Sequence, residues 1–353
     1  MPTANPNSPT PDPAQRAVVG FVVIGRNEGD RLTTCLESMM TVAAAPKASA
    51  EKPPIIYVDS GSSDDSVTRA RALGVSVITL DKDRPFTAAR ARNEGYEALI
   101  SAAPQTTHIM FIDGDCALLP GFVDAAIDPF TAEQSDDEGK KIGLVTGFTR
   151  ERYPERSLYN RFCDIEWRGP VGDIEACGGI FMVSRDAFEA AGGFNPVIIA
   201  AEDDELCIRL RRKGFSLVRI DQDMCWHDAN ITRFGQWWRR AERAGHAFAG
   251  VGDLHPGYFA GARRRVILWA GALPLLIALG LVTLGPAAFL LLGLYGVSFY
   301  RTRAGLIARH IEPRFATPYA GFLVLGKFPN LIGMVQHWWQ RRRGQTVDIV
   351  EYK

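Results

Sequence analysis

Short apolar runs alternate with amphipathic segments between residues 18 and 220. An apolar run at residues 18–24 precedes a helical pattern near residues 31–40, and a second run at 55–58 precedes another helical pattern at 65–73. Alternation of this kind predicts βαβ units around a largely parallel sheet in an α/β domain. Ligands of such sheets bind beyond the carboxyl ends of the strands, so we expect the chemistry in the loops that follow the apolar runs.

One apolar run, at residues 109–112, ends in Asp113, Gly114 and Asp115. Mg²⁺ and Mn²⁺ prefer hard oxygen ligands and are commonly held by one or two carboxylates together with substrate phosphates. The pair of aspartates therefore suits a divalent cation that bridges a diphosphate. The same residues also suit a hairpin turn, because Asp-Gly after an apolar run is a strong turn signal.

The loops after the first two strands are also polar. Residues 25–28 include Asn27 and Glu28, and Asp59 ends the second strand before a run of small residues. Serine and aspartate favour a capped helix start at this point. An ordinary strand-to-helix turn has the same preferences, so both interpretations of the Asp59 loop stay open.

Residues 87–95 form a third polar segment, with Arg90, Arg92 and Asn93 in or near the first turn of a predicted helix. Cations at this end of a helix oppose its dipole. A bound anion therefore explains the two arginines better than helix stability does.

Two later segments complete the pattern. Gly178 and Gly179 open a predicted strand over residues 176–183, and paired glycines allow a ligand or another backbone to approach closely. Residues 201–214 begin with four acidic side chains and end with basic ones and a glycine. A surface helix favours the same order of charges, and only the other motifs shift the balance towards catalysis.

Composition narrows the classes of protein. The chain has 353 residues, 46% of them hydrophobic, which is enough for an α/β core and a further element. Lys and Arg number 40, as do Asp and Glu, so the net charge does not indicate nucleic acid. Six cysteines without a CxxC pair argue against a zinc site and a disulfide framework, and we expect reduced thiols in a cytosolic domain.

An uncharged run of about 35 residues at 266–300 exceeds the roughly 20 that one membrane helix needs. Gly285 and Pro286 divide it, and basic clusters lie on both sides, at 263–265 and at 301–303. A single crossing would place the second cluster outside, against the positive-inside tendency. We therefore expect a transmembrane hairpin or a re-entrant segment.

Residues 322–340 mix aliphatic side chains with two tryptophans and precede three arginines at 341–343. Tryptophan beside arginine suits the headgroup layer, which predicts an amphipathic interfacial helix. The alternative is a helix packed on the catalytic domain.

In this order the motifs resemble those of family 2 glycosyltransferases with the GT-A fold, over about residues 18–250, and in particular membrane-associated members that act on exopolysaccharides or lipid-linked saccharides. The motifs that carry the resemblance are residues 26–28, 58–62, 89–93, 113–115, 177–179, 192–194 and 202–203, the last leading into Leu206 and Arg209. The resemblance implies a Rossmann-like GT-A domain with a mostly parallel, mixed sheet. It also implies a nucleotide-diphospho-sugar donor, Mg²⁺ or Mn²⁺, and transfer to an acceptor hydroxyl with inversion.

Roles follow from the resemblance at matching positions. Asp203 corresponds to the catalytic base, with Glu202 beside it. Asp115 corresponds to the direct metal ligand, Asp113 to a contact on the ribose and metal side, and His227 to a further metal or diphosphate ligand, although a lone histidine is often structural. The chemistry agrees, because deprotonating the acceptor and stabilising the leaving diphosphate require separate groups.

Asp59 corresponds to the carboxylate that contacts the nucleobase or ribose. The predicted nucleotide-sugar contacts are Asn27, Glu28, Asp59, Arg90, Arg92, Asn93, Asp113, Gly178, Gly179, Arg240 and Arg243. The last two lie in residues 236–243, which loosely match the Gln-x-x-Arg-Trp motif of processive members. The order of residues differs there, which argues against polymer synthesis.

The predicted organisation is a disordered tail at 1–16, a catalytic domain at 17–250, the membrane segment at 251–304 and the interfacial segment at 305–353. We expect the protein to lie at the inner (cytoplasmic) membrane, with its catalytic domain in the cytosol. Expected partners are the donor, a saccharide or lipid-linked acceptor and membrane lipids, without nucleic acid. The alternatives are a sugar nucleotidyltransferase, which would carry a Gly-rich loop with Arg and Lys after its first strand, and a non-catalytic scaffold, against which the intact aspartates argue.

Overall fold

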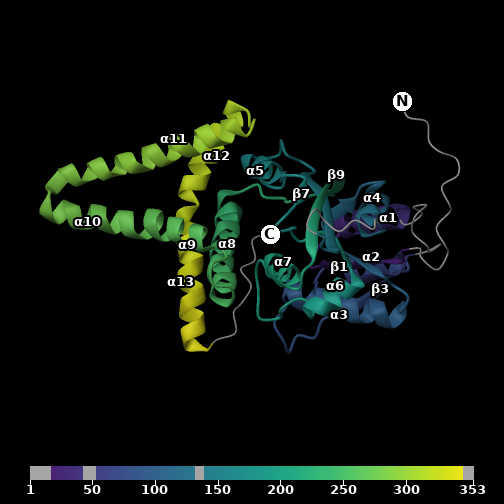
Figure 1. Cartoon of the computed structure of the whole chain (residues 1–353). Helices are drawn as coiled ribbons and strands as arrows, with labels where there is room; N and C mark the ends of the chain where they lie inside the picture. Colours follow the sequence, from purple (N-terminus) through teal and green to yellow (C-terminus); the bar gives the residue numbers. More distant parts are fainter. Residues whose placement is uncertain (1–16, 43–52, 132–138, 345–353) are drawn as a thin grey trace, which may run out of the picture.

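A computed structural model describes residues 17–42, 53–131 and 139–344. The predicted tail at 1–16 and the end of the interfacial segment lie outside the described residues. The described chain forms a nine-stranded mixed sheet flanked by helices, followed by a helical extension that projects from one side (Figure 1).

The first half of the sheet is parallel. Its strands lie in the order β3-β2-β1-β4, and every neighbouring pair runs in the same direction. The elements are β1 (Val19–Gly25), α1 (Asp30–Val42), β2 (Ile55–Asp59), α2 (Ser66–Ala72), β3 (Ser76–Thr79), α3 (Ala88–Ala102) and β4 (His108–Asp113). The apolar runs become these strands because both faces of the sheet are covered.

Each face of the sheet has its own core. In β1, Phe21 and Val23 belong to the core that α1, α2 and α4 (Phe122–Thr131) cover, while Val22 and Ile24 belong to the core under α3. A side chain at Gly95 of α3 would overlap Val22. The glycine therefore lets α3 lie directly on β1, which fixes the direction in which the other residues of this helix point.

The second half of the sheet is mixed. β8 is antiparallel to β4 and β6, β5 and β7 are antiparallel to β9, and β6 is parallel to β9. The elements are β5 (Cys116–Leu118), β6 (Ile142–Glu151), α5 (Leu158–Glu166), β7 (Gly172–Asp173), β8 (Phe181–Ser184), α6 (Arg185–Ala191), α7 (Glu202–Arg212) and β9 (Ser216–His227). The sheet is mixed as expected, with its parallel pairs confined to the first half and to β6 with β9.

Two details differ from the sequence predictions. The Asp-Gly segment after β4 is not a hairpin turn, because β5 pairs with β9 and not with β4. The strand predicted from residue 176 begins only at Phe181, because Gly178 has a φ of +77° and Gly179 lies against a buried arginine. Both segments are loops that turn the chain at the edge of the sheet.

The polar loops meet because of the strand order. β1, β2 and β4 are parallel, so the loops that follow them share one edge. β2 lies on one side of β1 and β4 on the other. The loops after β1 and β4 therefore lead to opposite sides of the sheet, and the strand order reverses at β1. In open α/β sheets this divergence leaves the crevice in which ligands bind.

The projecting extension is a helical hairpin (Figure 1). Its first arm is one helix over Ala260–Thr283, made of α9 (Ala260–Val266), the π-helical η2 (Ile267–Ala272) and α10 (Leu273–Thr283). The second arm comprises the 3₁₀ segment η3 (Gly285–Leu292) and α11 (Gly293–Ala308), and the chain turns at Gly285, where φ is +61°. By length and composition, Ala260–Thr283 is the one helix in the described part of the chain that could cross a membrane.

The last helix, α13 (Lys327–Arg343), follows α12 (Pro313–Leu325) and packs against α8 (Phe234–Leu254). A side chain at Gly333 would overlap the backbone of α8, and the Asn330 amide donates to the Ala241 carbonyl at 2.6 Å. The face of α13 that carries Asn330 and Gly333 therefore packs against α8, as the alternative prediction of a helix packed on the domain expects. Ile332, Val335 and Trp339 on α13 remain 42%, 51% and 55% exposed.

Candidate active site

The loops after β1 and β2 are joined through Asn27. Its backbone is left-handed, with φ of +57°, and its side-chain oxygen accepts the Ser63 N–H at 2.7 Å. The backbone N–H of Asn27 donates to Ser62 Oγ at 2.9 Å, and that of Glu28 donates to Ser66 Oγ at 3.1 Å. Asn27 and Glu28 thus lie at the expected edge, where the amide of Asn27 holds the two loops together.

Asp59 shapes the second loop. Its buried carboxylate accepts the N–H groups of Gly61 and Ser62, both at 3.0 Å, and the Tyr57 hydroxyl at 3.1 Å. These bonds turn the backbone sharply at the end of β2. The predicted contact of Asp59 with a nucleobase or ribose stays a prediction.

Gly114 separates the two aspartates that follow β4. Its N–H donates to the Ile24 carbonyl at 2.8 Å, and an added Cβ would lie 3.2 Å from Glu28 Cγ and 3.3 Å from that same carbonyl oxygen. A larger residue would push the β1 and β4 ends apart. The tight contact leaves Asp113 and Asp115 on opposite sides of the glycine, with different partners.

Asp115 lies with His227, which ends β9. The Nε2 atom of His227 is 3.2 Å from Asp115 Oδ2, and possible ligand atoms of Asp115, Cys116 and His227 lie within 4.8 Å of one another. Burial raises the pKa of the Cys116 thiol well above its usual range, so this sulfur is a poor ligand for a hard cation. The Asp115 carboxylate is the hard ligand that Mn²⁺ or Mg²⁺ prefers when phosphate oxygens and water complete the coordination, and the imidazole beside it offers an additional nitrogen ligand.

Asp113 belongs to a different cluster, centred on Arg92. The Arg92 guanidinium donates to Asp113 Oδ1 at 2.8 Å, to Glu202 Oε1 at 2.5 Å and to the Gly179 carbonyl at 3.2 Å. An added Cβ at Gly179 would lie 2.9 Å from Arg92 Nη2 and 3.2 Å from Asp113 Oδ2. Gly179 is therefore small because the arginine occupies the adjacent space.

The acidic end of α7 completes the site. Ala201, just before the helix, has a left-handed backbone with φ of +58°, a strained conformation for alanine. Burial, together with the negative charges of Asp204 and Glu202, raises the pKa of Asp203 to about 8, although Arg92 opposes the shift. A carboxylate with a pKa near neutrality is well matched to accepting a proton under physiological conditions.

Comparison with known proteins gives the family. Residues 21–192 match the family model described as glycosyl transferase family 2, and residues 162–231 match the model described as the N-terminal domain of galactosyltransferase. Residues 21–192 therefore form a glycosyltransferase family 2 domain, and the chain is a glycosyltransferase. No curated protein sequence matches it significantly.

Comparison with solved structures gives one match in architecture and two weaker likenesses. The mannosyltransferase PcManGT from Pyrobaculum calidifontis, in complex with GDP-Man and Mn²⁺, superposes with a TM-score of 0.55 and 16% identity, over 95% of this chain and 92% of that one. Residues 1–349 of S. aureus TarS give a TM-score of 0.47 and 10% identity, over 93% and 92% of the two chains. Glucosyl-3-phosphoglycerate synthase from Mycobacterium tuberculosis, in complex with Mn²⁺, UDP-Glc and PGA, gives 0.46 and 19%, over 68% and 80%. The first likeness establishes the GT-A fold for this glycosyltransferase.

Two predicted binding residues of α3 have structural contacts in the glycosyltransferase. Arg90 donates to Glu94 at 2.7 Å and to the carbonyl oxygens of Asp81 and Arg84 at 2.9 and 2.8 Å, so it holds the loop before α3. The Asn93 amide bonds both the N–H and the carbonyl of Phe194 at 2.8 Å. Asn93 therefore anchors the Gly-Gly-Phe turn rather than pointing into the Arg92 cluster.

Arg240 and Arg243 lie on α8. Arg240 forms a two-pronged ion pair with Glu166 of α5, with both N–O distances at 2.9 Å, and Arg243 is half-buried one turn further along. The structure places Arg240 at the contact between α5 and α8. The predicted roles of both arginines in donor binding stay predictions.

Trp167 is part of the site that sequence reasoning missed. Its ring stacks on His227 with centroids 4.4 Å apart and planes 4° apart, which restrains the imidazole beside Asp115. The residue follows α5 in a segment without a recognisable motif, so only the fold brings it to the histidine.

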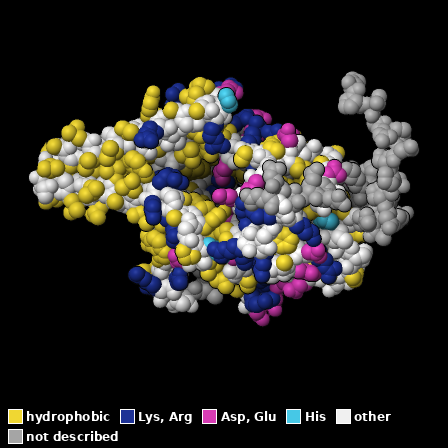
Figure 2. All heavy atoms as spheres, in the orientation of Figure 1, with side chains coloured by type: hydrophobic (Ala, Val, Ile, Leu, Met, Phe, Trp, Pro, Cys, Tyr) yellow, Lys and Arg dark blue, Asp and Glu magenta, His cyan; other side chains and the backbone are white. Residues whose placement is uncertain are grey.

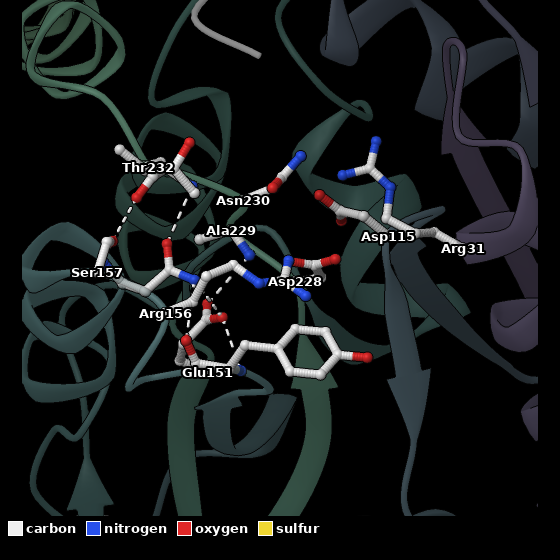
Figure 3. A network of polar contacts seen from close by, with 12 residues as sticks. Arg31, Asp115, Glu151, Arg156, Ser157, Asp228, Ala229, Asn230 and Thr232 are labelled. Atoms are coloured by element: carbon white, nitrogen blue, oxygen red, sulfur yellow. Dashed lines mark hydrogen bonds and ion pairs between the residues drawn. The ribbon is translucent and has the colours of Figure 1, made fainter.

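Glu151 was missed as well. Its buried carboxylate accepts the N–H groups of Ala229 and Tyr153 and the Asn160 amide, each at 3.0 Å, and it pairs in register with His227. Figure 3 shows this carboxylate at the centre of the contacts that join the loops after β6 and β9. Its signal in the sequence is a lone acid at the end of an apolar strand.

Proposed function

We propose that this glycosyltransferase transfers a sugar from a nucleotide-diphospho-sugar to an acceptor hydroxyl, with a divalent cation and with inversion. The observation that carries the proposal is the division of the acidic groups into two sites. Asp115 lies with His227, whereas Asp203 follows Glu202 at the start of α7, where Arg92 links Glu202 to Asp113 of β4. Two sites allow the leaving diphosphate and the incoming hydroxyl to be handled by different groups.

Asp115 and His227 are the residues that would hold Mg²⁺ or Mn²⁺. When bound, such an ion supplies positive charge that stabilises the departing diphosphate. The imidazole would stay oriented through its stack on Trp167, and Asp115 is almost fully buried, with 2% of its side chain exposed. The positive charge of Arg92 is shared by Asp113 and Glu202, so its role is to fix the two carboxylates near the donor.

Asp203 would act as the general base. The acceptor oxygen forms a bond with the anomeric carbon, the bond from that carbon to the diphosphate oxygen breaks, and the hydroxyl proton moves to the carboxylate. A single displacement of this kind inverts the anomeric configuration. A positioned base contributes about 10²- to 10⁴-fold to such a reaction.

Nucleotide binding tests the proposal. Calorimetry compares UDP, GDP, dTDP and CDP with and without Mn²⁺ on the detergent-purified chain, and then on Asp115→Ala and Asp203→Asn. We expect one nucleotide to bind in the presence of Mn²⁺, no binding to Asp115→Ala, and unchanged binding but no transfer with Asp203→Asn. Absence of binding by any nucleotide would refute the donor assignment, and equal loss of binding in both variants would refute the division of roles.

The acceptor and the cellular location form a second part of the proposal. We infer that the hairpin enters the inner (cytoplasmic) membrane and brings the site to a lipid-linked or surface saccharide. Val282 on the first arm and Leu290 on the second are 85% and 82% exposed. Apolar side chains cover the hairpin in Figure 2, with Lys and Arg near its base. An apolar surface of this extent needs a partner that removes it from water.

Vesicle flotation tests the membrane assignment. The double variant Val282→Arg/Leu290→Arg places one charge on each arm of the hairpin. Each charge costs about 2.5–3.5 kcal/mol at the centre of a membrane helix, so membrane binding should fall by about 10⁴-fold. Val197→Arg is the matched control, because Val197 is 76% exposed on the catalytic domain. Flotation of the double variant with the wild type would refute the insertion of the hairpin.

A further inference from the structure

The segment between α8 and α9 contacts α7, the helix that carries the proposed base Asp203. The Tyr258 hydroxyl donates to Asp204 Oδ1 at 2.8 Å, and the Nε2 atom of His255 lies 3.0 Å from Glu205 Oε1. The other ring nitrogen of His255 lies 2.8 Å from Arg212 Nη1, at the far end of the same helix. This segment, residues 255–258, is called the linker below.

The linker is also the start of the hairpin. Gly257 has a φ of +103° and Phe259 a φ of +56°, so the chain turns tightly on both sides of Tyr258. The helix of the first arm begins at Ala260, two residues after Tyr258. A displacement of that arm is therefore transmitted to α7 through a short, hydrogen-bonded turn.

Asp204 is the neighbour of the proposed base. Burial raises the pKa of Asp204 to about 6, while the hydrogen bond from Tyr258 opposes the increase. A charged Asp204 in turn raises the pKa of Asp203, together with Glu202 on the same helix, whereas Arg92 from α3 lowers it. The linker thus contacts a carboxylate that influences the proton affinity of Asp203.

We propose that Tyr258 is a positioning residue through which the hairpin holds the acidic end of α7 in its working arrangement. The inference rests on the proposed function, in which Asp203 is the base. Without the Tyr258 hydroxyl, Asp204 takes up a proton more readily and loses its negative charge at a higher pH. The pKa of Asp203 then falls, so Asp203 becomes a weaker base that is ionised at lower pH.

The test is the pH profile of donor turnover in Tyr258→Phe. The probe is hydrolysis of the nucleotide-diphospho-sugar whose nucleotide binds in calorimetry, measured with Mn²⁺ from pH 5 to pH 9. We expect the acidic limb of kcat/KM to move down by about 0.5–1 pH unit, with kcat about threefold lower and Kd for the nucleotide unchanged. Tyr295→Phe is the matched control, because its hydroxyl donates to the Trp269 carbonyl within the hairpin and leaves α7 untouched.

A second variant identifies the route. Asp204→Asn removes the charge on which Tyr258 acts, so it should shift the acidic limb in the same direction, and adding Tyr258→Phe should shift it no further. An unchanged profile in Tyr258→Phe, or an equal shift in both backgrounds, would overturn the inference while the wild type remains active. A wild type that neither binds a nucleotide nor turns over donor would refute the proposed function instead.

Discussion

Replacing Arg92 with methionine tests whether one buried cation holds the two halves of the site together. Methionine keeps an apolar stem of similar length but removes both hydrogen-bonded ion pairs. The change leaves the carboxylates of Asp113 and Glu202 facing each other without the charge that separates them. We expect a large loss of folding free energy.

The structure sets the magnitude. The side chains of Arg92 and Glu202 are 2% and 8% exposed, whereas that of Asp113 is 32% exposed. Removing one partner of a buried pair typically costs about 3–5 kcal/mol, because a charge is left without compensation. Water can solvate Asp113 in part, so Glu202 carries most of the loss, and we expect about 3 kcal/mol.

Arg240→Met is the matched control. Arg240 also forms a two-pronged pair, but its side chain and that of Glu166 are 29% and 46% exposed, a geometry worth about 0–1 kcal/mol. Guanidinium unfolding of both variants in detergent, followed by tryptophan fluorescence, gives the two losses under the same conditions. A loss for Arg92→Met within about 1 kcal/mol of that for Arg240→Met would refute the reasoning.

Three further outcomes follow from the same site. Gly179→Ala should lower the free energy of unfolding by about 1–3 kcal/mol, because the new Cβ would lie 2.9 Å from Arg92. Gly235→Ala is the control: Gly235 has open space around it in α8, so this change should raise the free energy of unfolding by about 0.5–1 kcal/mol. Equal melting temperatures of the two variants would contradict the prediction. Asp203→Asn should melt several degrees above the wild type at pH 8 in EDTA but close to it at pH 4.5. The reason is that a pKa raised in the folded state makes the wild type lose stability as pH rises towards that pKa. A difference in melting temperature that does not depend on pH would argue against a raised pKa. Trp167→Leu should weaken Mn²⁺ binding about 10-fold in calorimetry with the nucleotide diphosphate present, because His227 loses its stacking partner, and unchanged affinity would show that the stack does not orient the ligand.

The sequence predicted the strands and their polar ends well. β1, β2 and β4 are buried on both faces and therefore read as continuous apolar runs. Parallel strands bring their ends to one edge, so the aspartate after β4 could be expected near other polar loops. The resemblance alone suggested His227 as a further metal or diphosphate ligand, and the fold brings it to Asp115 across 112 positions.

The direction of individual side chains could not be predicted. Arg90 and Arg92 look equivalent in the first turn of α3, yet two residues on a helix point about 200° apart. One arginine holds the loop before the helix and the other holds Asp113 and Glu202. The rotation of α3 that decides between them is set by packing at Gly95, which would clash with Val22 if it carried a side chain.

The acidic run at the start of α7 had two interpretations from sequence, a stable helix end and a catalytic motif, and the contacts distinguish its four carboxylates from one another. Glu202 is paired with Arg92. Burial opposes ionisation of Glu205, but hydrogen bonds from Arg209 and His255 lower its pKa overall. Asp204 accepts the Tyr258 hydroxyl. Three of the four carboxylates therefore have a partner that keeps them in place.

Asp203 differs from its three neighbours. Within the residues that the structure describes, no other side chain forms a hydrogen bond or ion pair with its carboxylate. Its pKa is raised by burial and by the charges on either side, against a smaller effect of its own backbone N–H. The three partnered carboxylates fix the start of the helix, and the negative charges of Asp204 and Glu202 increase the affinity of Asp203 for a proton. A helix end that only needed acidic residues for its dipole would gain nothing from this inequality, because the dipole favours all four charges alike. The unequal partnering thus supports the proposed role of Asp203 as the base, and it depends on Arg92, Tyr258 and His255, which approach from other parts of the chain.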